Sequence, residues 1–219
     1  MAMLVGCGRL GFDGGDASPA GEAGVIPDAP PGTMYVTFGE TPGADHANVT
    51  IDTFLDSTAP TTVRGGASTS LCDLSPQRNV LVRFDVSALA PTTTVLAAEL
   101  EVEVMNTAAS PTNDVFEVLE SWTEDAATWQ NRLVGTPWTT IGGSRGTTAL
   151  GTFAALARTS RLVIPLDAGG VSVVQHWVND PTANHGFALV SEAGSWDLAT
   201  RDHGTEVYRP LLRLTVPVN

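Results

Sequence analysis

The stretch Leu96-Ala97-Ala98-Glu99-Leu100-Glu101-Val102-Glu103-Val104 alternates between two kinds of side chain. Its even-numbered positions are all apolar, whereas Glu99, Glu101 and Glu103 occupy odd-numbered positions. Successive side chains of a strand point to opposite faces of a sheet, so this period of two predicts a half-buried β-strand. We expect its apolar face to turn inward and its three carboxylates to lie in water.

Similar short segments recur along most of the chain, with prolines near their ends. Because proline cannot donate to a strand ladder, it is tolerated best at strand ends and turns. Many short strands with such punctuation predict an all-β fold, an antiparallel β-sandwich of the jelly-roll type. The predicted strands are Met34–Phe38, Val49–Leu55, Thr69–Cys72, Val80–Val86, Val95–Met105, Val115–Leu119, Arg161–Leu166, Gly186–Ser191 and Leu211–Val216.

One segment departs from this period. Val171, Val174, Trp177 and Val178 are spaced by three, three and one residues, which places them on one side of a helix. We predict a short helix over Gly169–Val178 that closes one end of the sandwich.

The first 32 residues differ from the rest. Residues 8–32 are rich in Gly, Ala, Pro and Asp and have no apolar period, which is typical of a flexible tether. Before them, Leu4-Val5-Gly6-Cys7 fits a bacterial lipobox, in which the cysteine receives lipid. A signal peptide needs a longer apolar region before that cysteine, so we hypothesise that the start is truncated. The alternative is a chance match of four residues.

We therefore expect residues 1–32 to be a lipobox remnant with a tether, and residues 33–219 to be one jelly-roll domain. Lipidation at Cys7 would place the domain outside the cytoplasm, attached to a bacterial membrane or cell surface only through its lipid. Cys72 is expected to be a buried thiol in a strand.

Charge excludes several classes of partner and reaction. The 219 residues carry a formal net charge of -13, and all 11 basic residues are arginines. An acidic surface repels phosphate backbones, so nucleic acid is not an expected partner. Without lysine there is no Schiff-base or phosphate-loop lysine chemistry.

Several motifs occur in the order of one known family. They are Arg83-Phe84-Asp85-Val86-Ser87, Ala97-Ala98-Glu99-Leu100, Ser121-Trp122-Thr123-Glu124, Thr128-Trp129-Gln130-Asn131, Val171 to Asn179 followed by Gly186-Phe187-Ala188-Leu189, and Pro210-Leu211-Leu212-Arg213-Leu214. Together they resemble the DNRLRE domain, a bacterial and archaeal surface module also classed as an alginate-type carbohydrate-binding module. The resemblance covers roughly residues 52–216. Thr200-Arg201-Asp202 stands where the family often has Ser-Arg-Glu.

The resemblance implies a jelly-roll sandwich on secreted or cell-surface proteins, with polysaccharide as the partner. Because alginate is anionic, the acidity of this chain argues against that particular sugar.

The tryptophans are the candidate sugar-binding residues. Trp122 and Trp129, beside Glu124 and Arg132, could stack on pyranose rings, since carbohydrate and other ligand sites use flat apolar side chains. The alternative, which we favour, is that both indoles close one end of the core while Glu124 pairs with Arg132. Trp138 and Trp196 lie in less patterned loops and are better candidates for exposed platforms than Trp122 and Trp129.

Arg83 and Arg201 are the candidate ligand-binding cations. Arg83 alternates with Val82 and Phe84, so it lies on the face opposite to theirs. Arg83 either clamps a ligand or forms a structural ion pair with Asp85 or Asp202. Arg201 and Asp202 face the same choice between a ligand contact and an ion pair.

Metal and catalytic motifs are weak. A structural calcium ion is plausible for a sandwich of this type, although no Asp-x-Asp-x-Asp loop occurs. The carboxylates near predicted strand ends are Asp52, Asp56, Asp73, Asp167 and Asp197. The four histidines form no zinc motif, and no Gly-x-Ser-x-Gly elbow occurs, so we expect no enzyme.

The leading hypothesis is a non-catalytic, lipid-anchored module that binds polysaccharide. The alternative is a structural or adhesive surface domain that contacts proteins without a dedicated sugar site. Exposed indoles in a groove would favour the first, whereas buried indoles with a flat apolar patch elsewhere would favour the second.

Overall fold

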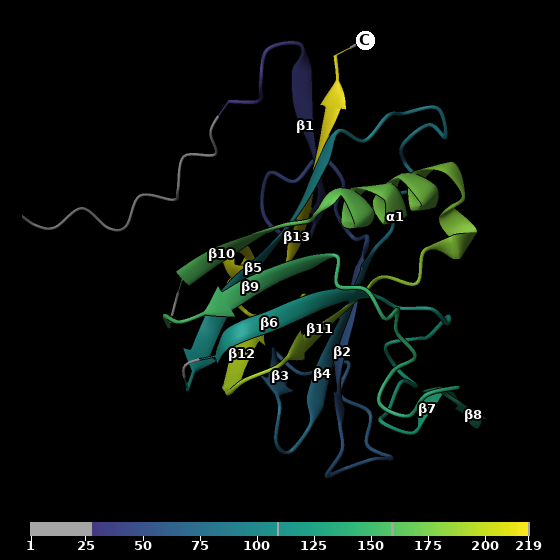
Figure 1. The fold of residues 1–219 in the computed structure, drawn as a ribbon, viewed down its shortest axis with the longest axis vertical. Helices are drawn as coiled ribbons and strands as arrows, with labels where there is room; N and C mark the ends of the chain where they lie inside the picture. The colour runs from purple at the N-terminus through teal and green to yellow at the C-terminus, as the bar shows by residue number, and fades with distance from the viewer. Residues whose placement is uncertain (1–27, 109, 159, 219) are drawn as a thin grey trace, which may run out of the picture.

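The computed structural model describes residues 28–108, 110–158 and 160–218. Within these ranges it contains thirteen strands, one α-helix and two short 3-10 helices (Figure 1). The strands are β1 (Thr33–Gly39), β2 (Thr50–Asp56), β3 (Thr69–Asp73), β4 (Arg78–Phe84), β5 (Ala97–Thr107), β6 (Ser110–Glu117), β7 (Asn131–Leu133), β8 (Thr136–Pro137), β9 (Gly151–Ala155), β10 (Ser160–Pro165), β11 (Phe187–Ser191), β12 (Ser195–Ala199) and β13 (Leu211–Pro217). The helices are α1 (Ala168–Asn179), η1 (Pro181–Ala183) and η2 (Glu206–Tyr208).

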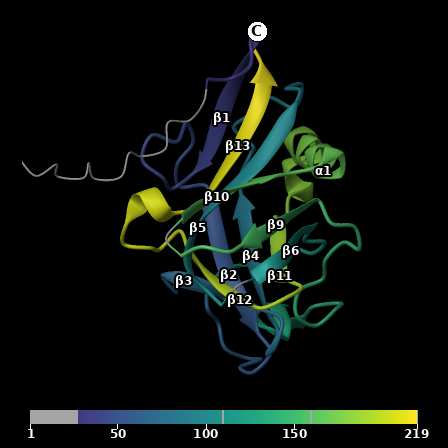
Figure 2. The ribbon, with the colours of Figure 1, turned by 60° about the vertical axis from the view of Figure 1, so that its left-hand side comes forward.

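Eleven of the strands form a curled antiparallel sheet with the order β1-β13-β5-β12-β3-β4-β11-β6-β9, in which β10 also pairs with β5 and β2 also pairs with β4. Strands β7 and β8 form a separate two-stranded sheet. Side chains from β13 and β5 share one apolar cluster with side chains from β4 and β11, so these two parts of the sheet face each other. We call β1, β13, β5 and β10 layer A, and β2, β4, β11, β6 and β9 layer B (Figure 2). The predicted all-β antiparallel sandwich is confirmed.

The helix closes one end of this sandwich (Figure 1). Val174, Trp177 and Val178 are buried and belong to the main core cluster. Asp167 caps the helix, since its carboxylate accepts a hydrogen bond of 2.9 Å from the Gly170 amide. The predicted helix is thus confirmed. Within the described residues, no helix has the length and apolar character needed to cross a membrane.

All nine predicted strands are present, but four others were missed. β7 and β8 have three and two residues, which is too short for any periodic signal. β9 begins at Gly151, and glycine is a poor strand former. β12 follows the turn glycine Gly194, and it places Trp196 in a strand where an irregular loop was expected.

The outer face of layer A is less exposed than predicted. Glu101 is 6% exposed and Glu103 is 5% exposed, so the expectation that both lie in water is wrong. Arg213 of β13 lies 3.0 Å from Glu101, and Arg161 of β10 lies 3.2 Å from it on the other side. Strands on both sides of β5 therefore supply arginines that cover its carboxylates.

A segment from η2 completes this cover. Arg161 donates a 2.9 Å hydrogen bond from Nη1 to the Arg209 carbonyl, which holds the segment after η2 against the sheet. Arg213 also contacts Glu99 at 2.6 Å. We call Glu99, Glu101, Arg161 and Arg213 the β5 ladder, since these residues run across three neighbouring strands.

Layer B carries a second apolar cluster on its outer face. Side chains alternate along its strands, so that Phe54 of β2 faces the main core while its neighbour Leu55 faces outward into this second cluster. The irregular segment 118–150 folds over that face and buries it. The second cluster consists of Leu55, Leu81, Phe116, Val118, Trp122, Ala127, Trp138, Ala188 and Val190.

Candidate functional site

Trp138 and Trp196 are not surface platforms. Trp138 is 3% exposed and Trp196 is 1% exposed, so the prediction that they are exposed is wrong. Trp138 donates a 2.9 Å hydrogen bond to the Thr128 carbonyl from within the second apolar cluster. Trp196 faces the main core from β12 and meets the edge of Phe153 at 5.3 Å. Neither ring leaves a face for a ligand.

Trp122 and Trp129 both pack on layer B. Trp122 is buried in the second apolar cluster, and its indole nitrogen donates a 2.8 Å hydrogen bond to the His185 carbonyl. Trp129 is half-buried against the same cluster. A side chain at Gly142 would lie 2.7 Å from the Trp129 ring, so this glycine lets the loop approach. These contacts support the interpretation that both indoles close an apolar cluster.

The expected partner of Glu124 is wrong. Arg132 lies 3.5 Å from Glu120, whereas Glu124 lies 3.4 Å from Arg201. Arg132 also donates to the Ser121 carbonyl at 3.0 Å, within its own loop. Glu124 therefore pairs outside its own loop, with a residue of the loop after β12.

Glu124 and Arg201 cover the free edge of β2, which pairs only with β4. The Asp52 amide donates to Glu124 Oε1 at 3.4 Å, and Arg201 Nη1 donates to the Thr50 carbonyl at 2.7 Å. These bonds satisfy backbone groups that an edge strand otherwise exposes. The loop after β12 and the loop after β6 therefore meet at this edge.

Negative charge is in excess at this edge. Asp52, Glu124 and Asp202 surround the single guanidinium of Arg201, which lies 3.4 Å from Glu124 and 3.9 Å from Asp202. We call these four residues the acidic cluster. Arg201 thus forms ion pairs, one of the two roles considered for it.

Asp52 is the buried member of the acidic cluster. Burial raises the pKa of its carboxyl well above the usual range, and the charges of Glu124 and Asp202 raise it further. One carboxylate oxygen, Oδ2, accepts a 2.7 Å hydrogen bond from the Arg201 amide. The other, Oδ1, is buried and has no hydrogen-bond partner among the described residues. Burial also raises the pKa of Glu124.

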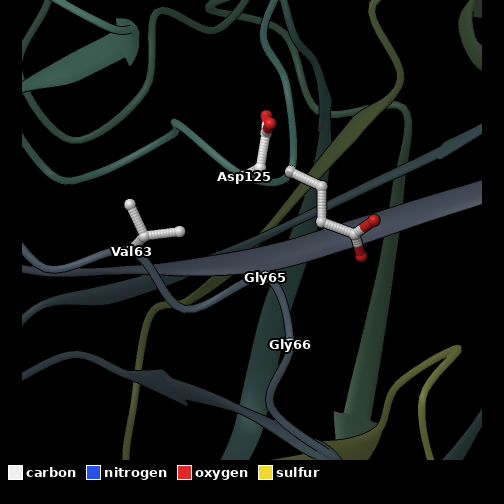
Figure 3. Close-up of a pocket in the computed structure, with 5 residues that line it drawn as sticks. Val63, Gly65, Gly66 and Asp125 are labelled. Carbon is white, nitrogen blue, oxygen red and sulfur yellow. The ribbon is translucent and has the colours of Figure 1, made fainter.

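An open depression of about 390 Å³ adjoins the acidic cluster. Its lining residues are Val63, Gly65, Gly66, Glu124 and Asp125. Figure 3 shows Val63 and Asp125 with the two glycines below them. Glu124 lies beside β2, since its carboxylate accepts a hydrogen bond from the Asp52 amide. We call this the β2 depression.

Two adjacent glycines shape the β2 depression. A side chain at Gly65 would lie 2.2 Å from the Glu124 carbonyl, so only glycine permits this approach of the two loops. A side chain at Gly66 would meet nothing within 4 Å. The Gln130 amide also donates to the Pro60 carbonyl at 3.1 Å, which ties the same loops together farther along. Gly65 therefore allows the two loops to come into contact, and Gly66 leaves space in the depression.

Arg83 lies elsewhere. It pairs with Ile51, which packs on the second apolar cluster, so Arg83 is on the outer side of layer B. Within the described part of the chain no ion pair includes Arg83, so the predicted pairing with Asp85 or Asp202 is wrong. Burial lowers its pKa. The structure thus does not bring Arg83 together with Arg201.

Three of the five carboxylates considered for calcium have other partners. Asp56 and Asp73 both contact Arg78, and Asp167 caps α1. Over residues 28–108, 110–158 and 160–218, no three His, Cys, Asp or Glu side chains are grouped so that they could hold a metal ion. A structural calcium ion stays a prediction. Cys72 is buried in β3 as expected, and burial raises the pKa of its thiol to about 12.

Residues 44–145 match the family model of carbohydrate-binding module family 96. The match covers less than half of the chain, but it contains every residue that lines the β2 depression. Arg201 and Asp202 lie outside it. A search of curated proteins found no match. The matched region is thus similar to a carbohydrate-binding module, which is a binding class rather than a catalytic one.

Proposed function

We propose that this protein is a non-catalytic module that binds a neutral polysaccharide at the β2 depression. The observation that carries the proposal is that the depression lies wholly inside the region similar to carbohydrate-binding module family 96. The resemblance to the DNRLRE domain, four of whose motifs lie inside this region, agrees with the same class.

The lining of the β2 depression suits a sugar ring. Carboxylates accept strong hydrogen bonds from hydroxyl groups, and Glu124 and Asp125 supply two of them. Val63, at 43% exposed, offers an apolar contact for the C–H face of a ring. Gly66 leaves space between these groups. The site therefore combines apolar contact with a few polar groups, as small-molecule sites do.

The charge of the site favours neutral sugars. The acidic cluster has three carboxylates and one guanidinium, and the whole chain has a net charge of -13. A uronate or sulfate group would be repelled at such a surface. We therefore expect galactomannan, xylan, laminarin or pullulan, rather than alginate, to be retained.

Affinity gel electrophoresis of the 219-residue chain tests this proposal. Each gel contains one of these four neutral polysaccharides or alginate, and the expected result is retarded migration in at least one neutral gel. Gly66→Leu fills the depression and should weaken retention at least about tenfold, the effect of losing a central contact. Gly204→Leu is the matched control, because Gly204 also lies in open space.

A second pair of variants removes a contact instead of adding bulk. Val63→Ser should weaken retention, whereas Val163→Ser, at a valine of similar exposure (42%), should not. Retention in the alginate gel alone, or equal retention of all variants, would contradict the proposed site.

The tether and anchor form a separate part of the proposal. Cys7 and residues 8–27 lie outside the described residues, so the lipobox motif alone supports them. We propose that Cys7 carries lipid and that residues 8–32 hold the domain outside the cytoplasm. Membrane fractionation of the full-length gene product should find it in the membrane, and Cys7→Ala should release it. An unacylated, wholly released protein would end this part of the proposal.

A structural or adhesive surface domain is the second candidate function. It is favoured by the burial of Trp122, Trp138, Trp177 and Trp196, which leaves no exposed row of indoles among the described residues. Met34, Leu96 and Val218 are each about half-exposed on neighbouring strands of layer A, as such a contact surface requires. Self-association in sedimentation experiments that Leu96→Ser abolishes would support it.

A further inference from the structure

A second depression lies beside turns at one end of the sandwich. Its volume is about 330 Å³. It is formed by the β3–β4, β5–β6 and β11–β12 turns, and its lining residues are Asp73, Leu74, Ser75, Ala108, Gly194 and Ser195. Leu74 is 49% exposed, although its neighbour Asp73 is buried. We call this the turn depression. Like the β2 depression, it combines one apolar side chain, a carboxylate and small residues.

A row of alternating charges connects the two depressions. Asp73, which lines the turn depression, pairs with Arg78. Arg78 lies 3.4 Å from Asp56, and Asp56 lies 3.5 Å from Arg64. Arg64 follows directly after Val63, which lines the β2 depression. Four residues in contact therefore lead from one depression to the other.

The arginines of this row are the groups that face solvent. The side chains of Arg64 and Arg78 are 36% and 21% exposed, whereas those of Asp56 and Asp73 are 5% and 7% exposed. A guanidinium has five N–H donors, more than its carboxylate neighbours use here. The remaining donors can bind hydroxyl oxygens of a chain that crosses the row. The two carboxylates are buried and the two guanidiniums face solvent, so this surface is polar but its charges balance locally.

We infer that the two depressions are subsites of one surface, which binds an internal stretch of a linear neutral polysaccharide along the row from Val63 to Asp73. This inference rests on the proposed function and extends it to the class of ligand. Both depressions are open, so the ends of the sugar chain need not be enclosed. Ligands with several units should bind more tightly than short ones, since linked contacts at two subsites act together.

The test uses whichever of the four neutral polysaccharides retards the wild-type chain, together with its oligosaccharides from disaccharide to octasaccharide. Leu74→Ser removes the apolar contact of the turn depression. We expect this variant to bind the polysaccharide at least about fivefold more weakly than wild type, as truncation of a contact residue does. Its affinity for the disaccharide, which fits the β2 depression alone, should not change.

Two further variants keep the test decisive. Leu119→Ser is the matched control, since Leu119 is 52% exposed and lines neither depression. Ser195→Tyr fills the turn depression without removing an apolar contact and should also weaken only the longer ligands. Circular dichroism checks that each variant is folded. If either Leu74→Ser or Ser195→Tyr does not fold, the test uses the other of these two variants.

The outcomes separate this inference from the proposed function. If no neutral gel retards the wild-type chain, the proposed function is wrong and the inference fails with it. If Gly66→Leu loses retention but Leu74→Ser and Ser195→Tyr bind long and short sugars like wild type, only the two-subsite inference is overturned. Weaker binding of both turn-depression variants to long sugars alone supports it.

Discussion

Two groups of charged residues in this protein differ in how their charges are compensated. In the β5 ladder, two carboxylates and two guanidiniums alternate, and buried Glu101 lies between Arg213 at 3.0 Å and Arg161 at 3.2 Å. In the acidic cluster, Glu124 and Asp202 share the guanidinium of Arg201, and Asp52 accepts a hydrogen bond from the Arg201 amide. Asp52 Oδ1 and Glu101 Oε1 are both buried without a hydrogen bond among the described residues, but only Glu101 Oε1 has an ion pair, with Arg213.

The difference separates a structural role from a binding role. The β5 ladder joins three strands and is covered by the segment after η2, so its charges hold layer A together. The acidic cluster is left with excess negative charge beside an open depression. Ionisable groups with perturbed pKa values next to a depression are a common mark of functional sites. Breaking each group in turn should therefore affect different properties.

The largest effect is expected from Arg213→Met. Removing this guanidinium leaves Glu101 buried with half of its compensation, and losing one partner of a buried ion pair costs about 3–5 kcal/mol. Urea unfolding should show this loss in the free energy of unfolding, while retention in polysaccharide gels by the folded protein is unchanged. Arg158→Met, at an exposed arginine, should change stability by less than about 0.5 kcal/mol. Equal stability of the two variants would show that the β5 ladder is not structural.

A smaller effect is expected where the loops meet the acidic cluster. Gly65→Ala places a methyl group 2.2 Å from the Glu124 carbonyl, which forces the loops apart and should cost about 1–3 kcal/mol. Gly66→Ala meets no such obstacle and should be neutral or stabilise by up to about 1 kcal/mol, since alanine restricts the unfolded chain. Thermal unfolding of the pair checks this. A loss of stability in Gly66→Ala as large as that in Gly65→Ala would contradict the described contact.

The smallest effect is expected from Asp52→Asn, and it depends on pH. The pKa of Asp52 is raised in the folded state, so the folded protein holds a proton that the unfolded chain releases near pH 4. The stability of the wild type should therefore fall as pH rises from about 4 through the folded pKa. Asparagine cannot ionise, so the variant should be more stable than wild type at pH 7 and nearly equal to it below pH 4.

Urea unfolding between pH 3 and pH 8 measures this difference. A variant that is less stable than wild type at pH 7, by the same amount at every pH, would mean that ionised Asp52 contributes a favourable contact. In that case the charges of the acidic cluster would stabilise the fold, as those of the β5 ladder do, and the two groups would not differ in role.

The sequence predicted the strands and the helix because their signals are local. Apolar residues at a period of two marked nine strands, and the spacing of Val171, Val174 and Trp177 marked α1. The burial of Trp138 and Trp196 was missed, because it depends on a loop folding onto layer B and on strand β12, which carries a weak signal. Glu101 and Glu103 were misplaced for a similar reason: their cover comes from Arg213 and Arg161, on strands distant in sequence.

The candidate site was predicted only in part. Arg201 and Glu124 were named as charged candidates, and Asp52 was named for calcium alone. No local pattern could bring them together, since residues 52, 124 and 201 meet only when the loop after β6 and the loop after β12 fold over the edge of β2. The adjacent glycines Gly65 and Gly66 were the available signal, since paired glycines in a loop indicate either close approach or open space.

The most direct test of the central claim is amide chemical-shift mapping by NMR. The ¹⁵N-labelled chain is titrated with the neutral polysaccharide, or its octasaccharide, that retards it in affinity gels. We predict that the amides of Gly65, Gly66 and Asp125 shift most, with smaller shifts near Leu74. Shifts confined to the apolar residues Met34, Leu96 and Val218, or the absence of any shift, would contradict a sugar site at the β2 depression.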